Sequence, residues 1–236
     1  MKDGFLQLSD VLIHYTESGS GEPFLFLHGN EEDASYFAKQ TEFFSAHYRV
    51  IALDTRAHGK SGRGNKSLTF ETLSDDVRDA MDLLGLAKAH VLGFSDGGNT
   101  AIMLTLKYPQ KVESLLLNGA NLNPFGMKCS VLAGIFLEYT ILSFASLFKK
   151  ELRSKKEIVS LMAQQPHIDP KELKHIMIPT SVIVGQHDMI RTAHSALIAE
   201  AIPNAVLITI SDADHFVAAK HPGCFNEIVE QFLKKV

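Results

Sequence analysis

The chain has 236 residues, enough to bury a full α/β core in one domain, and its 45% hydrophobic and 21% charged content is ordinary for a globular protein. A net charge of −4 and scattered Lys and Arg argue against a nucleic-acid partner. The two cysteines, Cys129 and Cys224, have neither metal-ligand nor disulfide-framework spacing, so we expect no metal and no other cofactor.

The predicted elements follow an amino-terminal segment, residues 1–10, that lacks the charged and apolar parts of a secretory signal, so the cytoplasm is the default location. Alternating residues over 11–15 predict an antiparallel strand. The apolar run 24–27 predicts a short strand, and 50–53 a parallel one. Apolar residues recurring at helical spacing predict a helix over 69–84.

The next segment, residues 91–101, is the most informative of the chain. An apolar, β-prone run ends at Gly-x-Ser-x-Gly, and a helical pattern follows at once. This order of strand, tight turn and helix is the context of a nucleophile elbow. Gly93 and Gly97 are expected because a Cβ at either position would meet the neighbouring strand or helix. Ser95 is therefore the predicted nucleophile.

A serine needs a base, and the base needs an orienting acid, both downstream of the serine on such a scaffold. The buried-type strand 180–185 runs into Asp188, and the strand 206–210 leads to His215. Parallel strands end at one edge of a sheet, so these two residues and Ser95 should share one crevice.

Rivals for the acid are Asp212 and Asp214, which lie too close in sequence to His215 to reach its far ring nitrogen. Asp188 is therefore the predicted acid. His187 lies on the wrong loop for the base. The remaining histidines without a partner pattern are expected to be solvated or structurally satisfied: His14, His47, His90, His167, His175, His194 and His221.

An oxyanion hole is predicted at the backbone N–H groups of Asn30, after the strand 24–27, and of Asp96, after the nucleophile. His28 precedes Gly29 and is expected to be a structural histidine that bonds the loop backbone.

The remaining elements are a strand over 112–117 and helices over 191–201 and 226–235. Between residues 121 and 169 there is no strand signal, only helical pattern.

Five motifs follow one another along nearly the whole chain: Leu27-His28-Gly29-Asn30, Asp54-Thr55-Arg56-Ala57-His58-Gly59-Lys60-Ser61, Gly93-Phe94-Ser95-Asp96-Gly97-Gly98, Gly185-Gln186-His187-Asp188 and Asp214-His215-Phe216. In this order they resemble those of the α/β-hydrolase fold family, of the single-domain, cap-bearing type. The resemblance implies an α/β fold with a mostly parallel, eight-stranded-type sheet flanked by helices, in one domain over 1–236. Asp54 and Arg56 should then be structural, with Ala57 at a position where the family usually has glycine. Members with an aspartate nucleophile, the haloalkane dehalogenases and epoxide hydrolases, are disfavoured by Ser95.

The same resemblance makes 121–169 a small helical cap inserted after the sixth strand. Its apolar part, 129–148, raises the question of a membrane span, which needs roughly 20 mostly uncharged apolar residues. Glu138 near its centre argues against stable membrane insertion and favours a lid over an apolar pocket. Its large apolar side chains are the candidate pocket residues: Phe125, Phe136, Phe144 and Phe148.

The side chain of Asp96 has two interpretations. A carboxylate at a helix N-terminus complements the helix dipole by roughly 0.3–1 kcal/mol. Alternatively it faces the pocket and attracts a cationic group, because the Gly-x-Ser-Asp-Gly-Gly variant resembles that of the biphenyl-hydrolase-like amino-ester hydrolases.

Two classes of function remain. The first is a serine hydrolase that cleaves a carboxylic ester or related acyl bond of a small, partly apolar substrate through an acyl-enzyme. C–C bond hydrolases and peptidases use the same triad and stay open as variants. The second class is a ligand-binding or signalling protein with slow or vestigial hydrolysis. The sequence leaves the natural substrate and the oligomeric state open.

Overall fold

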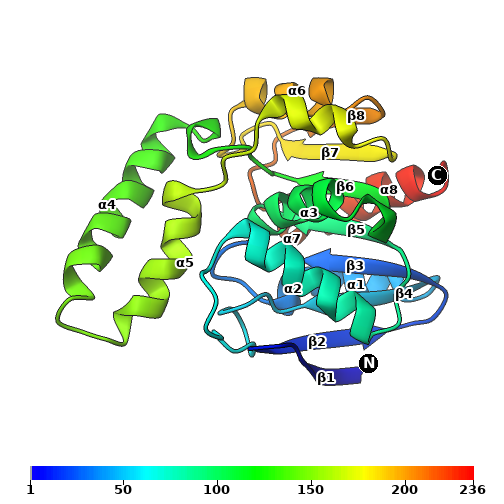
Figure 1. Ribbon diagram of the computed structural model, residues 1–236. Helices are drawn as coiled ribbons and strands as arrows, with labels where there is room; N and C mark the ends of the chain where they lie inside the picture. The colour runs from blue at the N-terminus through cyan, green and yellow to red at the C-terminus, as the bar shows by residue number, and fades with distance from the viewer. Residues whose placement is uncertain (1) are drawn as a thin grey trace.

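The computed structural model describes residues 2–236 and consists of one eight-stranded sheet with helices on both faces (Figure 1). The strand order is β1-β2-β4-β3-β5-β6-β7-β8. β2 is antiparallel to both of its neighbours, and the strands from β4 to β8 are parallel. The predicted fold class is thus confirmed. The strands are β1 Lys2–Gln7, β2 Leu12–Ser18, β3 Glu22–Leu27, β4 Tyr48–Leu53, β5 Ala89–Phe94, β6 Val112–Asn118, β7 Thr180–Gly185 and β8 Ala205–Ile210.

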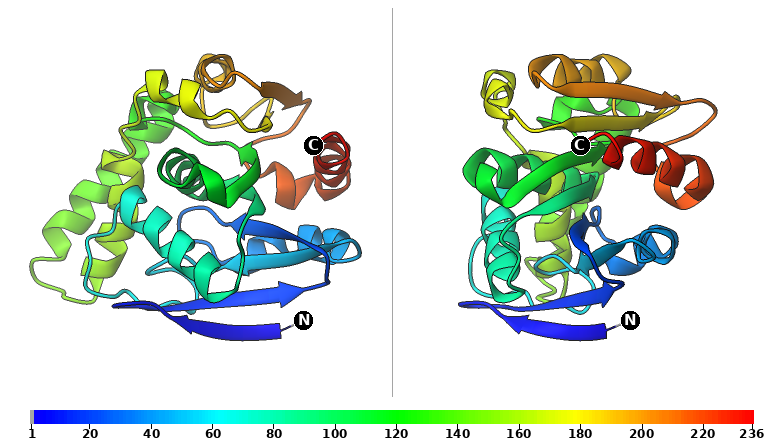
Figure 2. Two further views of the ribbon diagram at one scale, coloured as in Figure 1. Left: turned by 45° about the vertical axis from the view of Figure 1, so that its right-hand side comes forward. Right: turned by 90° about the vertical axis from the view of Figure 1, so that its right-hand side faces the viewer.

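The helices divide between the two faces of the sheet, as the edge-on view shows (Figure 2). One apolar core joins the sheet to α2, α3 and α6, and a second, rich in phenylalanine, joins it to α1, α7 and α8. Both faces of the parallel strands are therefore covered, which is why β3, β5 and β7 each contain a run of apolar residues without polar alternation. The helices are α1 Ala38–Phe44, α2 Phe70–Leu83, α3 Asp96–Lys107, α4 Cys129–Ala145, α5 Leu152–Gln164, α6 Thr192–Ala201, α7 Val217–Lys220 and α8 Pro222–Leu233.

Differences from the sequence-based expectation lie at the periphery. β1 was not expected; it is an edge strand paired only with β2, and its sequence, Lys-Asp-Gly-Phe-Leu-Gln, lacks a clear alternation of apolar and polar residues. α8 begins at Pro222 rather than 226, because proline is favoured in the first turn of a helix, where its missing N–H costs nothing. α1 and α7 are each shorter than two full turns and have too few residues for a periodic signal.

The segment between β6 and β7 forms a hairpin of α4 and α5 that projects from the body of the molecule (Figure 1). A small core of its own, including Leu132, Ile135, Leu142 and Val159, holds the two helices together. Within residues 2–236, none of the helices combines the length and apolar character that crossing a bilayer requires.

Candidate active site

Ser95 occupies the turn between β5 and α3 with φ 52° and ψ −118°, a conformation that costs energy for a non-glycine residue. Its N–H donates to Asn118 O at 2.8 Å, which fixes the turn against the end of β6. The flanking glycines are required by space: a Cβ on Gly97 would lie 2.0 Å from Leu27 O, and one on Gly93 2.4 Å from the carbonyl oxygen of Gly97. The turn therefore has the geometry of a nucleophile elbow.

Asp188 and His215, predicted from separate strand ends, lie in direct contact. His215 Nδ1 is 2.7 Å from Asp188 Oδ1, and both side chains are buried. The same carboxylate oxygen accepts the N–H of Ile190 at 2.9 Å, which holds its orientation. Asp214 instead accepts the N–H of Phe216 at 3.0 Å and pairs with Lys220.

The His215 ring lies beside the elbow. Its centroid is 4.8 Å from that of Phe94, the residue before Ser95. A Cβ on Gly119, just past β6, would lie 2.6 Å from His215 Cε1 and 3.4 Å from Asp188 Oδ2. Gly119 has φ +66°, and its lack of a side chain leaves the space that the His215 and Asp188 side chains occupy. Sequence reasoning missed it, although a glycine two residues after the predicted strand 112–117 was an available signal.

The loop after β3 packs against the start of α3, so the two predicted oxyanion donors are neighbours. Asn30 Nδ2 donates to Asp96 Oδ2 at 2.7 Å. Across residues 2–236, neither the backbone N–H of Asn30 nor that of Asp96 donates to a protein acceptor. For Asp96 this follows from its position at the first turn of a helix.

The Asn30 amide also joins this loop to the hairpin, because Nδ2 donates to Ile158 O of α5 at 3.0 Å. One side chain thus connects the loop after β3, the start of α3 and α5. This contact fixes the hairpin next to the Ser95 turn.

Two carboxyl groups near His215 have unusual acidity. Burial raises the pKa of Asp96 to about 6, although the amide of Asn30 donates to it and opposes the shift. Burial likewise raises the pKa of Glu32 to about 7, opposed by the N–H of Gly29 at 3.3 Å. Glu32 had no signal in the sequence beyond its place two residues after Asn30.

The phenylalanines that we expected to line an apolar pocket are exposed to solvent rather than enclosed. Phe125 is 65% exposed, Phe144 67% and Phe148 76%, and Phe136 is also exposed. For Phe136 and Phe144 the reason is that α4 has apolar residues all around its circumference, while only the side facing α5 and the body is covered.

His28 has the structural role expected of it. Its Nδ1 donates to Gly29 O at 2.7 Å, and its Nε2 accepts the N–H of Thr55 at 3.0 Å. Burial lowers the pKa of His28 to about 4, so the ring is neutral and holds the loop that leads to Asn30.

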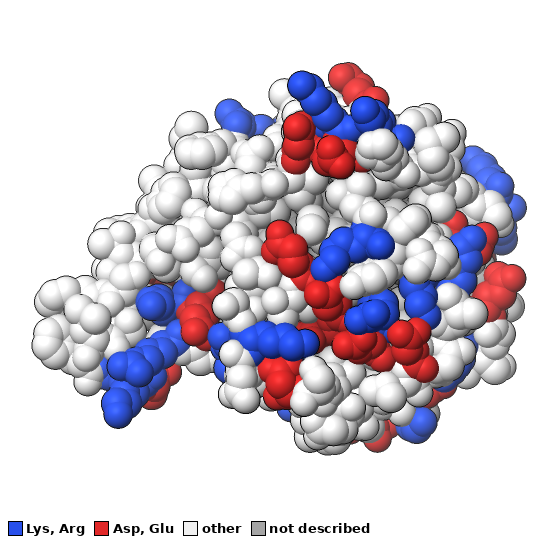
Figure 3. All heavy atoms as spheres, in the orientation of Figure 1, with Lys and Arg blue, Asp and Glu red and all other residues white. Residues whose placement is uncertain are grey.

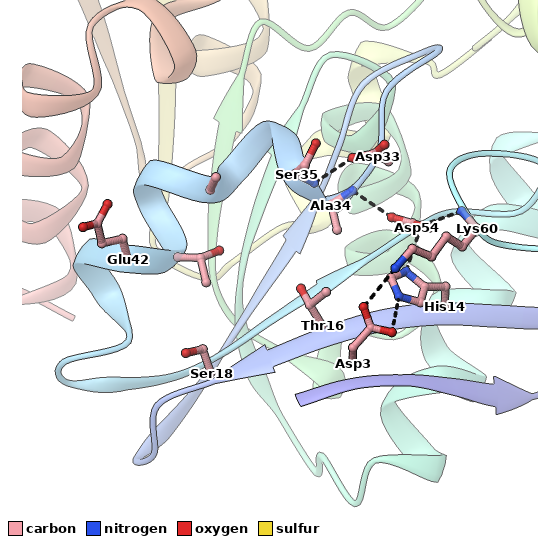
Figure 4. Close-up of a pocket in the computed structure, with 12 residues that line it drawn as sticks. Asp3, His14, Thr16, Ser18, Asp33, Ala34, Ser35, Glu42, Asp54 and Lys60 are labelled. Atoms are coloured by element: carbon pink, nitrogen blue, oxygen red, sulfur yellow. Dashed lines mark hydrogen bonds and ion pairs between the residues drawn. The ribbon is translucent and has the colours of Figure 1, made fainter. Parts of the chain in front are cut away.

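A cavity of about 470 Å³ lies apart from this cluster, between β2, α1 and the loop after β4 (Figure 4). Its polar wall is a network in which Asp54 accepts the N–H groups of Ala34 and Lys60, both at 2.7 Å, and contacts His14 Nδ1 at 2.8 Å. Asp54 therefore ties a strand end to neighbouring loops, and none of Ser95, Asp188 and His215 lines this cavity.

Comparison with protein families matches residues 22–134 to the alpha/beta hydrolase fold. The chain is 26% identical over 270 residues to a 2-hydroxy-6-oxononadienedioate/2-hydroxy-6-oxononatrienedioate hydrolase of Paraburkholderia phymatum, covering 95% of this chain and 92% of that protein. It is 31% identical over 165 residues to a 2-hydroxy-6-oxo-6-phenylhexa-2,4-dienoate hydrolase of Comamonas testosteroni, covering 65% of this chain and 54% of the other.

Among solved structures, one described as an N-acyl homoserine lactone degrading enzyme superposes with a TM-score of 0.79 at 27% identity, covering 97% of this chain and 100% of that one. The similarity therefore spans the hairpin as well as the sheet.

Proposed function

Because this chain is an α/β-hydrolase-fold protein and belongs to a family of hydrolases, we propose that it is a serine hydrolase that cleaves an acyl bond through a covalent acyl-enzyme. The observation that carries the proposal is the 2.7 Å contact between Asp188 and His215, placed beside the strained Ser95 turn. Such strain persists where the fold over-determines it, and it is concentrated at functional sites.

In the proposed reaction, Ser95 Oγ attacks the carbonyl carbon while His215 Nε2 takes the hydroxyl proton, and Asp188 stabilises the resulting imidazolium. The negative charge on the carbonyl oxygen is held by the free N–H groups of Asn30 and Asp96. The tetrahedral intermediate collapses, the leaving group receives the proton from His215, and the acyl group stays on Ser95. Water, activated by the same histidine, then releases the acid and restores the serine.

The substrate class follows from the groups around His215. The two nearby acidic side chains, Asp96 and Glu32, favour a neutral or cationic substrate over an anionic one, because each becomes charged close to neutral pH. We therefore propose a small neutral or amino-acyl ester or lactone, with the hairpin of residues 121–169 as the cap over it. The Asn30–Ile158 hydrogen bond supports that position.

A second candidate is suggested by the named relatives. Their 2-hydroxy-6-oxo-dienoate substrates contain ketone, enol and carboxylate groups but no ester, so their hydrolysis must break a C–C bond. The same serine and histidine could perform that reaction. The carboxyl groups of Asp96 and Glu32 disfavour it here, because the substrate is itself an anion.

The test combines labelling with a substrate panel. A fluorophosphonate probe should label the wild type once, at Ser95, and Ser95→Ala should abolish both labelling and turnover of nitrophenyl esters and lactones. Turnover of the dienoates in preference to the esters would select the second candidate. A correctly folded wild type that neither reacts with the probe nor turns over any of these substrates would contradict hydrolysis and leave the ligand-binding function.

Removal of the orienting acid gives an independent prediction. Asp188→Asn should lower kcat by about 10⁴-fold, because the amide favours the wrong histidine tautomer. Asp214→Asn and Asp212→Asn are the matched controls and should stay close to wild type. If Asp214→Asn were the inactive variant, the acid would be misassigned.

A further inference from the structure

The hairpin of α4 and α5 has an exposed side that no other part of the described chain covers. We define its apolar face as six exposed side chains on α4 and the turn that follows: Phe136, Leu137, Ile141, Phe144, Leu147 and Phe148. Leu137, Ile141 and Phe144 are spaced four and three residues apart, so they form one stripe along the helix, and Phe148 lies in the turn that follows, with its ring 5.4 Å from that of Phe144. Glu138, at the border of the face, pairs with Lys155 at 3.3 Å.

The size of this face is unusual for a protein surface. Single exposed apolar residues are common, but a contiguous group of large ones indicates an interaction site. Gly134 lies on the same side, and a Cβ there would meet nothing within 4 Å. The face belongs to a hairpin that projects from the body of the molecule, as the views from two sides show (Figures 1 and 2).

Cations gather at the end of the same hairpin. We define the basic tip as the five cationic side chains of residues 149–156, among which Glu151 is the one carboxylate: Lys149, Lys150, Arg153, Lys155 and Lys156. Within residues 2–236, all of these except Lys155 lack a salt-bridge partner. In Figure 3, uncharged residues cover most of the projecting part, and Lys and Arg side chains, drawn in blue, gather at its lower end.

From this juxtaposition we infer that the hairpin docks on an anionic lipid bilayer, with the apolar face entering the interface and the basic tip meeting the acidic headgroups. A large apolar face beside clustered Lys and Arg is the composition of interfacial membrane helices. The hairpin lies on the surface without spanning it, since none of the helices in the described chain could cross a bilayer. The inference does not depend on the proposed hydrolysis.

A bilayer fits better than a second copy of the chain. Two hairpins packed face to face would bring together two sets of four unpaired cations. Only Glu151 of each tip could offset them, since Glu138 and Glu157 are already paired. A peptide that binds in a groove is also disfavoured, because the face is the exposed outer side of a single projecting helix and offers no second wall. The anionic surface alone complements both parts of the hairpin.

The experiment uses the absence of tryptophan from the chain. Phe144→Trp introduces a single tryptophan in the apolar face, where Phe144 is 67% exposed, and Leu83→Trp places one at the end of α2, where Leu83 is 56% exposed. Each protein is mixed with vesicles of phosphatidylcholine alone and with vesicles of equal parts phosphatidylglycerol and phosphatidylcholine. We expect a blue shift for Phe144→Trp on the anionic vesicles, reversed by high salt, and none for Leu83→Trp.

Charge variants in the Phe144→Trp background test the contribution of the basic tip to vesicle binding separately from that of the apolar face. Lys149→Glu with Lys150→Glu should weaken vesicle binding about tenfold or more, since each juxtamembrane cation contributes measurably to affinity. Lys171→Glu with Lys174→Glu, two exposed lysines outside the hairpin, is the matched control and should bind as before.

Three results would overturn the inference. The first is no shift of Phe144→Trp on anionic vesicles, and the second is an equal shift for Leu83→Trp. The third is a concentration-dependent dimer that buries the Phe144→Trp fluorophore without lipid, which would make this face an interface between copies. Loss of ester turnover in Ser95→Ala with unchanged vesicle binding would show that membrane docking does not depend on hydrolysis at Ser95.

Discussion

Ser95 and its neighbours show that the site is built at the expense of local stability. The positive φ of Ser95 is strained, and Asp96 is a carboxyl group buried among amides and apolar side chains. Asn30 at 2.7 Å and Asn99 at 3.4 Å donate to that carboxyl, but neither carries a charge. The group is therefore held largely by neutral partners, and its ionisation is costly.

This cost predicts a pH-dependent effect of Asp96→Asn on stability. Burial raises the pKa of Asp96 from 3.8 to about 6, so between these values the unfolded chain releases a proton that the folded protein keeps. The contribution of Asp96 to the free energy of unfolding therefore falls as pH rises through this window. Relative to wild type, Asp96→Asn should gain up to about 3 kcal/mol between pH 4 and pH 7.

Urea unfolding of the two proteins at several pH values measures the difference. Changes in hydrogen bonding to the neighbouring amides contribute the same amount at each pH, so only the slope matters. A difference between the proteins that does not vary from pH 4 to pH 7 would mean that the carboxyl ionises normally.

At the scale of elements, the strand ends decide how the site is assembled. β3, β5, β6, β7 and β8 are neighbours in the sheet and end at one edge. A loop of the candidate site follows each of these strands, including the loop at Gly119 after β6. Each of these loops contacts the loop of the neighbouring strand. The hairpin joins this group through the hydrogen bond from Asn30 to Ile158, so it contacts the same loop that carries the proposed oxyanion donor.

Gly119 provides a prediction at this scale. Gly119→Ala would place a Cβ 2.6 Å from His215 Cε1 and displace the ring, and a displacement of about 1 Å can cost about 10²-fold in rate. Gly85→Ala is the matched control, because Gly85 also has positive φ, +68°, but its Cβ would meet nothing within 4 Å.

Both variants should lose about 1–2 kcal/mol of stability from the left-handed backbone. Activity should fall only in Gly119→Ala. Equal activities in the two purified variants would show that Gly119 has no role in positioning His215.

At the scale of the whole molecule, a buried ion network joins the antiparallel edge of the sheet to the parallel part. Arg56, fully buried after β4, contacts Asp76 of α2 at 2.7 Å and Asp10 of the β1–β2 turn at 2.9 Å. The bond from Arg56 holds the pKa of Asp10 well below its ordinary value, whereas burial raises that of Asp76. Three distant segments therefore depend on one guanidinium.

Arg56→Met should destabilise the protein by about 3–5 kcal/mol, since it leaves the buried carboxyl of Asp76 without its partner. Arg49→Met removes a partly exposed pair with Glu17 and should cost about 1 kcal/mol or less. Thermal or urea unfolding of both variants measures the contrast. A loss for Arg56→Met as small as that for Arg49→Met would show that the network adds little to the joining of the two parts.

The sequence by itself determined the features that depend on local chemistry and on chain order. The turn at Ser95 could be predicted because the tight strand–turn–helix geometry requires glycine at positions 93 and 97. The strands of the parallel sheet could be predicted because strands buried on both faces contain nearly continuous apolar runs. The positions of Asp188 and His215 followed from the rule that parallel strands end at one edge.

Only the tertiary structure decided which surfaces of these elements are covered. The phenylalanines of the hairpin are apolar whether buried or exposed, so composition could not show that Phe144 and Phe148 are exposed. The link from Asn30 to Ile158 joins residues 128 positions apart, and the acidity of Glu32 arises from burial that no local pattern encodes. These features depend on contacts between distant segments, which exist only once the chain has packed.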